Sequence, residues 1–76
     1  MEATQILNKL VEKKDLTADE TRAFLDDVFG GNVSPVLTGA ILTALRMKGE
    51  TTAEIIGLVQ SMRAYMKKVN APGAID

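Results

Sequence analysis

Few residues of this 76-residue sequence could perform chemistry, because it contains no Cys and no His. Without them there is no thiolate nucleophile, no imidazole base and no zinc site of the usual kind. An adjacent pair of carboxylates, Asp26-Asp27, could share a proton or hold a metal ion. Neighbouring residues of a helix diverge by about 100°, so two such carboxylates do not converge on one ion. We therefore expect a solvated face there, and we assign no catalytic, cofactor-binding or metal-binding residue.

A second candidate is a phosphate site at Gly30-Gly31-Asn32, since a glycine turn before a helix N-terminus can present free amides to an anion. The segment lacks the Lys and the second Gly of a P-loop, and it follows a helix rather than a strand. We interpret it as the C-cap of the preceding helix.

Basic residues near the ends of the last two predicted helices could form an anion site if those ends were neighbours. These residues are Arg46, Lys48, Arg63, Lys67 and Lys68. Antiparallel helices joined by a short turn place these ends apart, so we expect the five side chains to complement helix dipoles and to face solvent.

Two helices joined by a short turn with glycine also resemble a DNA-binding helix-turn-helix. A recognition helix contacts bases with its N-terminal residues, which here are Pro35, Val36, Leu37 and Thr38. The apolar side chains among them cannot hydrogen-bond to base edges. The 9 basic and 10 acidic residues give a net charge of -1, which attracts neither nucleic acid nor an anionic membrane. DNA binding stays an alternative, but we expect no nucleic acid and no membrane as partners.

The elements that position these residues must belong to one small domain, given the length of the chain. Hydrophobic residues make up 46% of the sequence and charged residues 25%, which is enough to form a core. The N-terminus lacks the basic start and the apolar run of a secretory signal. No segment approaches the roughly 20 apolar residues that span a bilayer. We therefore expect a cytoplasmic protein.

Helical periodicity and capping signals divide the chain into four helices, without a strand pattern. These helices are predicted from about Ala3 to Lys13, from Thr17 to Phe29, from Pro35 to Lys48 and from Thr51 to Val69. Thr17 begins a capping box, and Thr51 begins another unless Thr52, one residue later, is the cap. Ser34-Pro35 combines a cap with proline at the first helical position. The sequence predicts an all-α fold, a compact bundle of four short helices with the third helix central. Residues 1–70 would form this helical domain and residues 71–76 a linker.

The third and fourth helices carry more apolar surface than the chain can bury. The third is predicted to be surrounded, because its apolar residues cover about half of its circumference. In the fourth, the main apolar arc is expected to face the core; it consists of Ile55, Leu58, Val59, Met62, Met66 and Val69. Small residues at Gly57, Ser61 and Ala64 lie on roughly the opposite side, where they allow close approach of another backbone. Surplus apolar surface suggests docking to another chain, with Gly39, Leu42, Thr43, Ile56, Gly57 and Ser61 as candidate interface residues.

Several stretches are more specific than helical periodicity. They are Asp15-Leu16-Thr17 with Glu20, Val33-Ser34-Pro35, Ala44-Leu45-Arg46-Met47-Lys48-Gly49-Glu50-Thr51, Glu54-Ile55 and Met62-Arg63. With them, essentially the whole chain resembles the N-terminal helical region of anthranilate phosphoribosyltransferases, members of glycosyl transferase family 3 and relatives of the pyrimidine nucleoside phosphorylases. Arg46 and Glu50 stand where the phosphorylases more often carry an aromatic residue and a Met.

The resemblance implies both a fold and an activity. In that family a small helical domain lies beside a larger α/β domain and forms the subunit interface, so we expect a homodimer through the third and fourth helices. The family joins anthranilate to the phosphoribosyl group of phosphoribosyl pyrophosphate, with magnesium, in tryptophan biosynthesis. Its glycine-rich pyrophosphate-binding loop follows the helical region and has no counterpart among these 76 residues. We therefore expect this chain alone to be inactive and to serve as a dimerisation and scaffold domain.

Two alternatives stay open. The chain could be a free-standing helical module that binds a protein partner through its third helix, or it could be the N-terminal domain of a pyrimidine nucleoside phosphorylase. A strand and a glycine-rich loop encoded after Asp76 would support a domain of the larger enzyme, and a stop codon would support the module.

Overall fold

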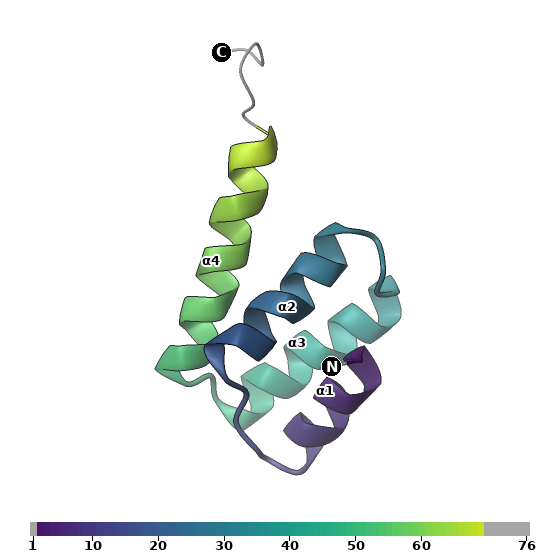
Figure 1. Ribbon diagram of the computed structural model, residues 1–76. Coiled ribbons are helices and arrows are strands. Elements are labelled where there is room, and N and C mark those ends of the chain that lie inside the picture. The colour runs from purple at the N-terminus through teal and green to yellow at the C-terminus, as the bar shows by residue number, and fades with distance from the viewer. Residues whose placement is uncertain (1, 70–76) are drawn as a thin grey trace.

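The computed structural model describes residues 2–69, which form four α-helices (Figure 1). The helices are α1 (Ala3–Val11), α2 (Ala18–Phe29), α3 (Pro35–Lys48) and α4 (Thr52–Val69). This part of the chain contains no strand, which confirms the all-α prediction. The linker predicted over residues 71–76 lies outside the described residues. Over residues 2–69, no helix has both the length and the apolarity that crossing a bilayer requires.

The predicted helix starts are confirmed by their hydrogen bonds. The hydroxyl of Thr17 accepts from the amide of Glu20 at 3.1 Å, and the Glu20 carboxylate accepts from the amide of Thr17 at 2.9 Å. The hydroxyl of Ser34 accepts from the amide of Leu37 at 3.1 Å. Each cap satisfies a donor that has no partner inside its helix.

Helix α1 ends two residues before the predicted boundary. Lys13 has a φ of 63°, which is a left-handed conformation. Its amide donates to the carbonyl of Leu10, and the amide of Lys14 donates to the carbonyl of Lys9, both at 2.9 Å. These two bonds close the C-terminus of the helix. The sequence gives no sign of this end, because a lysine occupies the left-handed position where glycine is usual.

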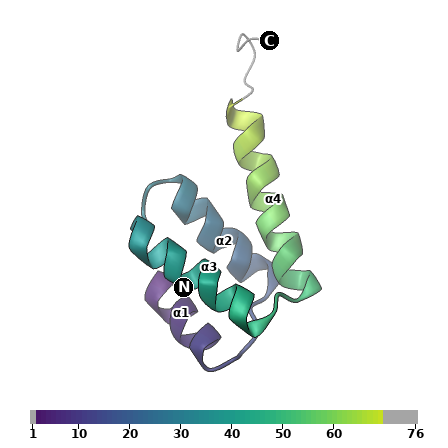
Figure 2. The ribbon, with the colours of Figure 1, turned by 180° about the vertical axis from the view of Figure 1, so that it is seen from behind.

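Helices α1, α2 and α3 share one apolar core, called the three-helix core below. Its buried members are Ile6, Leu10, Leu16, Phe24, Leu25, Ile41 and Leu45. Helix α1 packs along α3, and α4 packs along α2. Figures 1 and 2 show α4 leaning away from the other helices toward its C-terminal end. Within residues 2–69, the buried apolar residues thus come from the first three helices and the loop after α1.

Helix α3 contributes one face to this core and leaves the opposite face open. Ile41 and Leu45 are 0% and 1% exposed, whereas Val36 and Met47 are each 84% exposed. The third helix is therefore central to the core, as predicted. The prediction that it would be surrounded is wrong within residues 2–69, because the side that carries Val36 and Met47 lies open.

Helix α4 packs with the side that the sequence pattern assigned to the exterior. Gly57 and Ser61 are buried, and so is Glu54. The predicted core-facing residues Ile55, Val59, Met62 and Met66 are between 36% and 58% exposed. The prediction that the apolar arc faces the core is thus wrong for these four positions. Leu58 alone among the described members of that arc is partly buried against the core.

Candidate functional site

Of the acidic pair considered as a metal site, Asp26 makes contacts within the chain. Asp26 accepts a hydrogen bond from the Ser61 hydroxyl, and its other carboxylate oxygen lies 3.8 Å from Nε of Arg22. Asp27 is exposed. Over residues 2–69, no three Asp, Glu, His or Cys side chains gather as metal ligands would. Asp26 therefore connects α2 to α4 within the chain.

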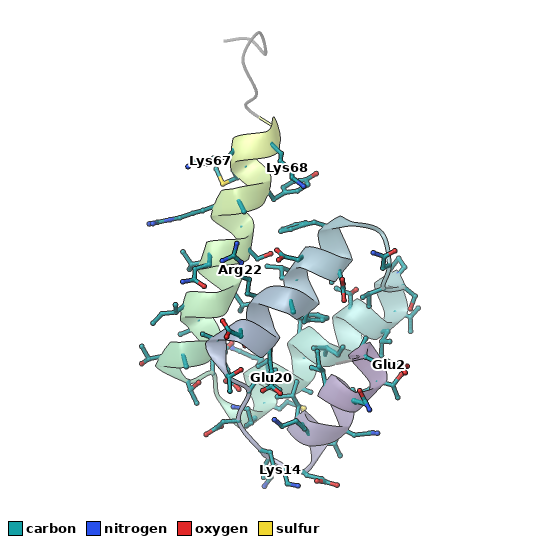
Figure 3. The ribbon with its side chains drawn as sticks, in the orientation of Figure 1. Glu2, Lys14, Glu20, Arg22, Lys67 and Lys68 are labelled. Atoms are coloured by element: carbon teal, nitrogen blue, oxygen red, sulfur yellow. The ribbon has the colours of Figure 1, made fainter. Side chains whose placement is uncertain are left out.

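The basic residues considered as an anion site lie at the end of α3 and in the second half of α4. Lys48 ends α3 and lies next to the start of α4, whereas Lys67 and Lys68 belong to the last turn of α4 (Figure 3). The prediction that these helix ends are apart is confirmed. The prediction that Lys48 faces solvent is wrong, because its side chain is only 6% exposed.

Lys48 belongs to a cluster with Asp15 and Glu54, which we call the buried ion cluster after its two buried members, Lys48 and Glu54; the Asp15 side chain is 66% exposed. Its Nζ donates to Oδ1 of Asp15 and to Oε1 of Glu54, each at 2.9 Å, and to the carbonyl of Gly49 at 3.0 Å. All three donor positions of the ammonium are therefore used. The cluster joins the end of α3 to the α1–α2 loop and to the first turn of α4.

The Glu54 carboxylate is the centre of this cluster. It is 0% exposed and accepts three hydrogen bonds. Oε1 accepts from Lys48 and, at 2.8 Å, from the amide of Thr51; Oε2 accepts from the amide of Leu16 at 2.7 Å. A buried carboxylate is tolerated when charged and neutral donors satisfy it in this way. The carboxylate thus connects three separate segments of the chain.

The partners of the cluster keep both Glu54 and Lys48 charged. Burial by itself would raise the pKa of Glu54, but the amides of Leu16 and Thr51 and the ammonium of Lys48 outweigh it and hold the pKa below its ordinary value. Burial would likewise lower the pKa of Lys48, yet the carboxylates of Glu54 and Asp15 raise it above its ordinary value. The pair is therefore fully ionised near neutral pH.

The sequence pattern assigned these residues to local roles and missed that they meet. Glu54 was predicted as the acidic member of a capping box, and that box is present, since the Glu54 amide donates to the Thr51 hydroxyl at 3.1 Å. Its second carboxylate oxygen makes the contact with the α1–α2 loop that no local pattern contains. One signal was available: Asp15, Lys48 and Glu54 all lie within the stretches that resemble the phosphoribosyltransferases.

Helix α4 approaches α2 closely at Gly57. A Cβ atom at this position would collide with the carbonyl oxygen of Ala18 and would lie 2.9 Å from Cβ of Thr21. Ser61 follows one turn later, is 0% exposed, and donates to Asp26. The stripe of small residues therefore does allow close backbone approach, as predicted, but the neighbouring backbone is α2 of the same chain.

The α2–α4 contact buries two of the six candidate interface residues and leaves the other four exposed. Gly57 and Ser61 are buried between α2 and α4, so they are not part of the free surface. Leu42 and Ile56 are 41% and 45% exposed. Gly39 and Thr43 are exposed as well. The structure thus leaves three of the candidates on α3 and one on α4, and it does not unite all six on one surface.

Helices α2 and α4 border an open cleft of about 490 Å³. Its lining residues are Arg22, Asp26, Phe29, Gly30, Ser61, Ala64, Tyr65 and Lys68. The rings of Phe29 and Tyr65 stack with their centroids 4.2 Å apart and their planes 17° apart. This stack joins the far end of α4 to the end of α2.

Two helices carry exposed stripes with the same spacing of i, i+4, i+7 and i+11, which places four residues on one side of a helix. The α3 stripe consists of Val36, Ala40, Thr43 and Met47, and the α4 stripe consists of Ile55, Val59, Met62 and Met66. A groove of about 330 Å³ between α1 and α3 borders the α3 stripe at Met47. Uncovered apolar surface of this kind is typical of a contact with another polypeptide.

Comparison with known proteins finds similarity to one protein family along the chain. A family model described as "Glycosyl transferase family, helical bundle domain" matches residues 4–66. An anthranilate phosphoribosyltransferase of Saccharolobus islandicus (strain L.S.2.15 / Lassen #1) is 43% identical over 76 residues, which are 100% of this chain and 22% of that protein. The enzyme of the same name from Saccharolobus solfataricus is 42% identical over the same shares.

A bacterial relative shows higher identity over a shorter stretch. The anthranilate phosphoribosyltransferase of Methylorubrum populi is 50% identical over 62 residues, which are 80% of this chain and 18% of that protein. The chain therefore spans about a fifth of the length of these curated relatives.

Proposed function

Because this chain belongs to the helical bundle domain of the glycosyl transferase family, we propose that it is the helical domain of an anthranilate phosphoribosyltransferase. The proposed parent activity is the transfer of a phosphoribosyl group from phosphoribosyl pyrophosphate to anthranilate, a step of tryptophan biosynthesis. Support comes from relatives of that name that are 42% to 50% identical to the chain. A cytoplasmic location is part of the same proposal.

The domain itself is proposed to act as a scaffold that joins two subunits through the α3 stripe. The observation that carries this proposal is the 84% exposure of Val36 and Met47, at the two ends of the stripe. In a two-fold contact between antiparallel α3 helices, Val36 of one copy would face Met47 of the other. Ala40 and Thr43 would meet near the axis, where small side chains permit close helix contact.

The α4 stripe is the proposed contact for the α/β domain that the resemblance places after the helical region. Helix α4 leads away from the three-helix core (Figure 2), and its stripe extends to Met66, in the last turns of the described chain. The dimer expected from the sequence through both α3 and α4 is thereby narrowed to α3.

Catalysis is proposed to depend on parts of the longer protein outside this domain. The magnesium ion that the resemblance implies prefers carboxylate and phosphate oxygens. Within residues 2–69 the acidic side chains do not gather in threes, and Glu54 and Asp26 are engaged by Lys48 and Ser61. These residues do not fit a magnesium site, so no catalytic step is assigned to them.

The activity is tested on the full-length product of the gene. With anthranilate, phosphoribosyl pyrophosphate and magnesium, we expect formation of phosphoribosylanthranilate and pyrophosphate, and no product with the 76-residue chain alone. Phosphorolysis of uridine or thymidine in place of this reaction would instead identify a pyrimidine nucleoside phosphorylase. A gene that ends at Asp76 would identify a free-standing module, and turnover by the purified 76 residues would also contradict the proposal.

The subunit contact is tested by light scattering at micromolar concentration. We expect the 8.2 kDa chain to be dimeric and Met47→Asp to be monomeric with an unchanged helix content. Leu42→Asp is the matched control, because Leu42 lies about 120° around α3 from the stripe and is 41% exposed. Dissociation by Leu42→Asp but not by Met47→Asp would move the interface to another face, and a monomeric wild-type chain would contradict the proposal.

A further inference from the structure

We propose that the buried ion cluster is a latch: it holds α4 against the three-helix core, and without it α4 is released as a unit while the core stays folded. This inference concerns the chain by itself and does not depend on the proposed enzymatic function. It rests on how α4 is attached along its length.

The attachment of α4 contains little apolar contact. Over residues 52–68, its buried residues are Glu54, Ser61 and Gly57, of which two are polar and one has no side chain. Leu58 is the partly buried apolar residue of α4 that packs on the three-helix core. Small and polar contacts of this kind contribute less by burial of apolar area than the Leu, Ile and Phe side chains of the core.

The buried charged attachment lies at the first turn of α4. Glu54 binds the ammonium of Lys48 and the amide of Leu16, so its carboxylate connects α4 both to α3 and to the α1–α2 loop. Removal of one partner from a buried ion pair leaves the other charge buried without compensation. That situation is relieved when α4 moves away and admits water, and such a movement needs no rearrangement of the three-helix core.

The far end of α4 has weaker attachments. There α2 and α4 border the open cleft, and two contacts join them: the hydrogen bond from Ser61 to Asp26, whose carboxylate is about half exposed, and the stack of Phe29 on Tyr65. Phe29 and Tyr65 are 37% and 42% exposed. Exposed contacts of this kind belong to the parts of a protein that open before the whole chain unfolds.

Tyr65 provides a direct probe of this opening, because it is the only Tyr and the sequence contains no Trp. The near-ultraviolet circular dichroism of the tyrosine band therefore reports whether Tyr65 is held in its stack. Hydrogen exchange of backbone amides, measured helix by helix, reports the state of α1, α2 and α3 in the same sample.

The test compares variants of the 76-residue chain. In Lys48→Met and in Glu54→Gln we expect loss of the Tyr65 dichroism and a fall of about tenfold or more in the protection of α4 amides, with less than about a twofold change in α1–α3. Lys9→Met is the control for charge removal, since Lys9 pairs with Glu20 at 3.2 Å on a part-exposed site, and it should leave both readouts unchanged.

Two results would overturn the proposal. Equal loss of protection in all four helices would mean that α4 and the core unfold together. An unchanged Tyr65 signal with intact α4 protection would mean that the cluster does not hold α4.

Discussion

The three-helix core and the α2–α4 contact are formed by different kinds of side chain. The three-helix core fills the space between its helices with large side chains such as Phe24 and Ile41, which are 1% and 0% exposed. The α2–α4 contact instead has Gly57 directly against the backbone of α2, and its buried polar residues are Thr21 and Ser61, each 0% exposed. Large apolar side chains fill the gap between helices at ordinary distances, whereas close helices leave no room for them. The same chain thus buries its large residues in one contact, whereas the aromatic pair of the other, Phe29 and Tyr65, stays partly exposed.

The largest effect is expected in the three-helix core. Phe24→Ala should lower the free energy of unfolding by about 3–5 kcal/mol, through lost burial and the cavity left behind. Phe29→Ala, on the same helix, is the matched control: Phe29 is 37% exposed and contacts Tyr65, so its loss should cost about 1 kcal/mol. Urea denaturation followed by circular dichroism measures both, and similar costs would mean that the two contacts do not differ as described.

The next largest effect is a loss of stability on acidification, which arises from Glu54 at the start of α4. The pKa of Glu54 is lowered on folding from its ordinary value of 4.5. Its charged form therefore contributes stability that is fully present above pH 4.5 and is lost as the pH falls through the lower folded value. The Glu54→Gln variant should lack this part of the pH dependence. Urea midpoints of both chains measured from neutral pH into the acid range test this, and parallel curves would contradict it.

At alkaline pH, Lys48 of the same ion pair is expected to change stability in the opposite direction, so that stability falls as the pH rises. The pKa of Lys48 is raised on folding above its ordinary value of 10.5. Its contribution is therefore fully present below pH 10.5 and is lost as the pH rises through the higher folded value. Together the two shifts predict that the cluster is intact across the whole neutral range.

Local signals predicted the helices well because they act over a few residues. The caps at Thr17 and Ser34 and the left-handed Gly31, with a φ of 78°, all form where the sequence placed them. The end of α1 was missed for the same reason, since Lys13 adopts a conformation that its residue type does not favour.

Long-range features were harder to predict, and α4 shows why. Hydrophobic periodicity assumes that the most apolar face is the buried one, but the collision that a Cβ at Gly57 would make with Ala18 depends on the position of another helix. The burial of Lys48 likewise depends on a carboxylate six residues later and on a loop 33 residues earlier. Hydrophobic periodicity predicts neither the approach of Gly57 to Ala18 nor the approach of Lys48 to its carboxylate partners.

Two glycine substitutions distinguish the effect of the close approach of α4 to α2 from the effect of helix propensity. Gly57→Ala should destabilise the chain by about 1–3 kcal/mol, because the added methyl forces α4 away from α2. Gly39→Ala adds the same methyl to α3, where nothing lies within 4 Å, and should stabilise the chain by up to about 1 kcal/mol through helix propensity. Urea denaturation compares the two. A neutral or stabilising Gly57→Ala would mean that α2 and α4 are not in close contact at this position.

The smallest effect is expected from an ion pair that lies beside the buried ion cluster but outside it. Arg46 and Glu50 approach to 3.9 Å with side chains 83% and 27% exposed, whereas Lys48 and Glu54 approach to 2.9 Å at 6% and 0%. Water and salt screen the first pair, so Arg46→Gln should change the free energy of unfolding by less than about 0.5 kcal/mol. Lys48→Met should cost several times more, because it leaves Glu54 buried without its cation. Raising the salt concentration should remove what little Arg46 contributes and leave the difference between the two variants in place. Equal costs at low salt would show that burial does not distinguish the two pairs, and the contrast between the surface of α3 and the start of α4 would then be lost.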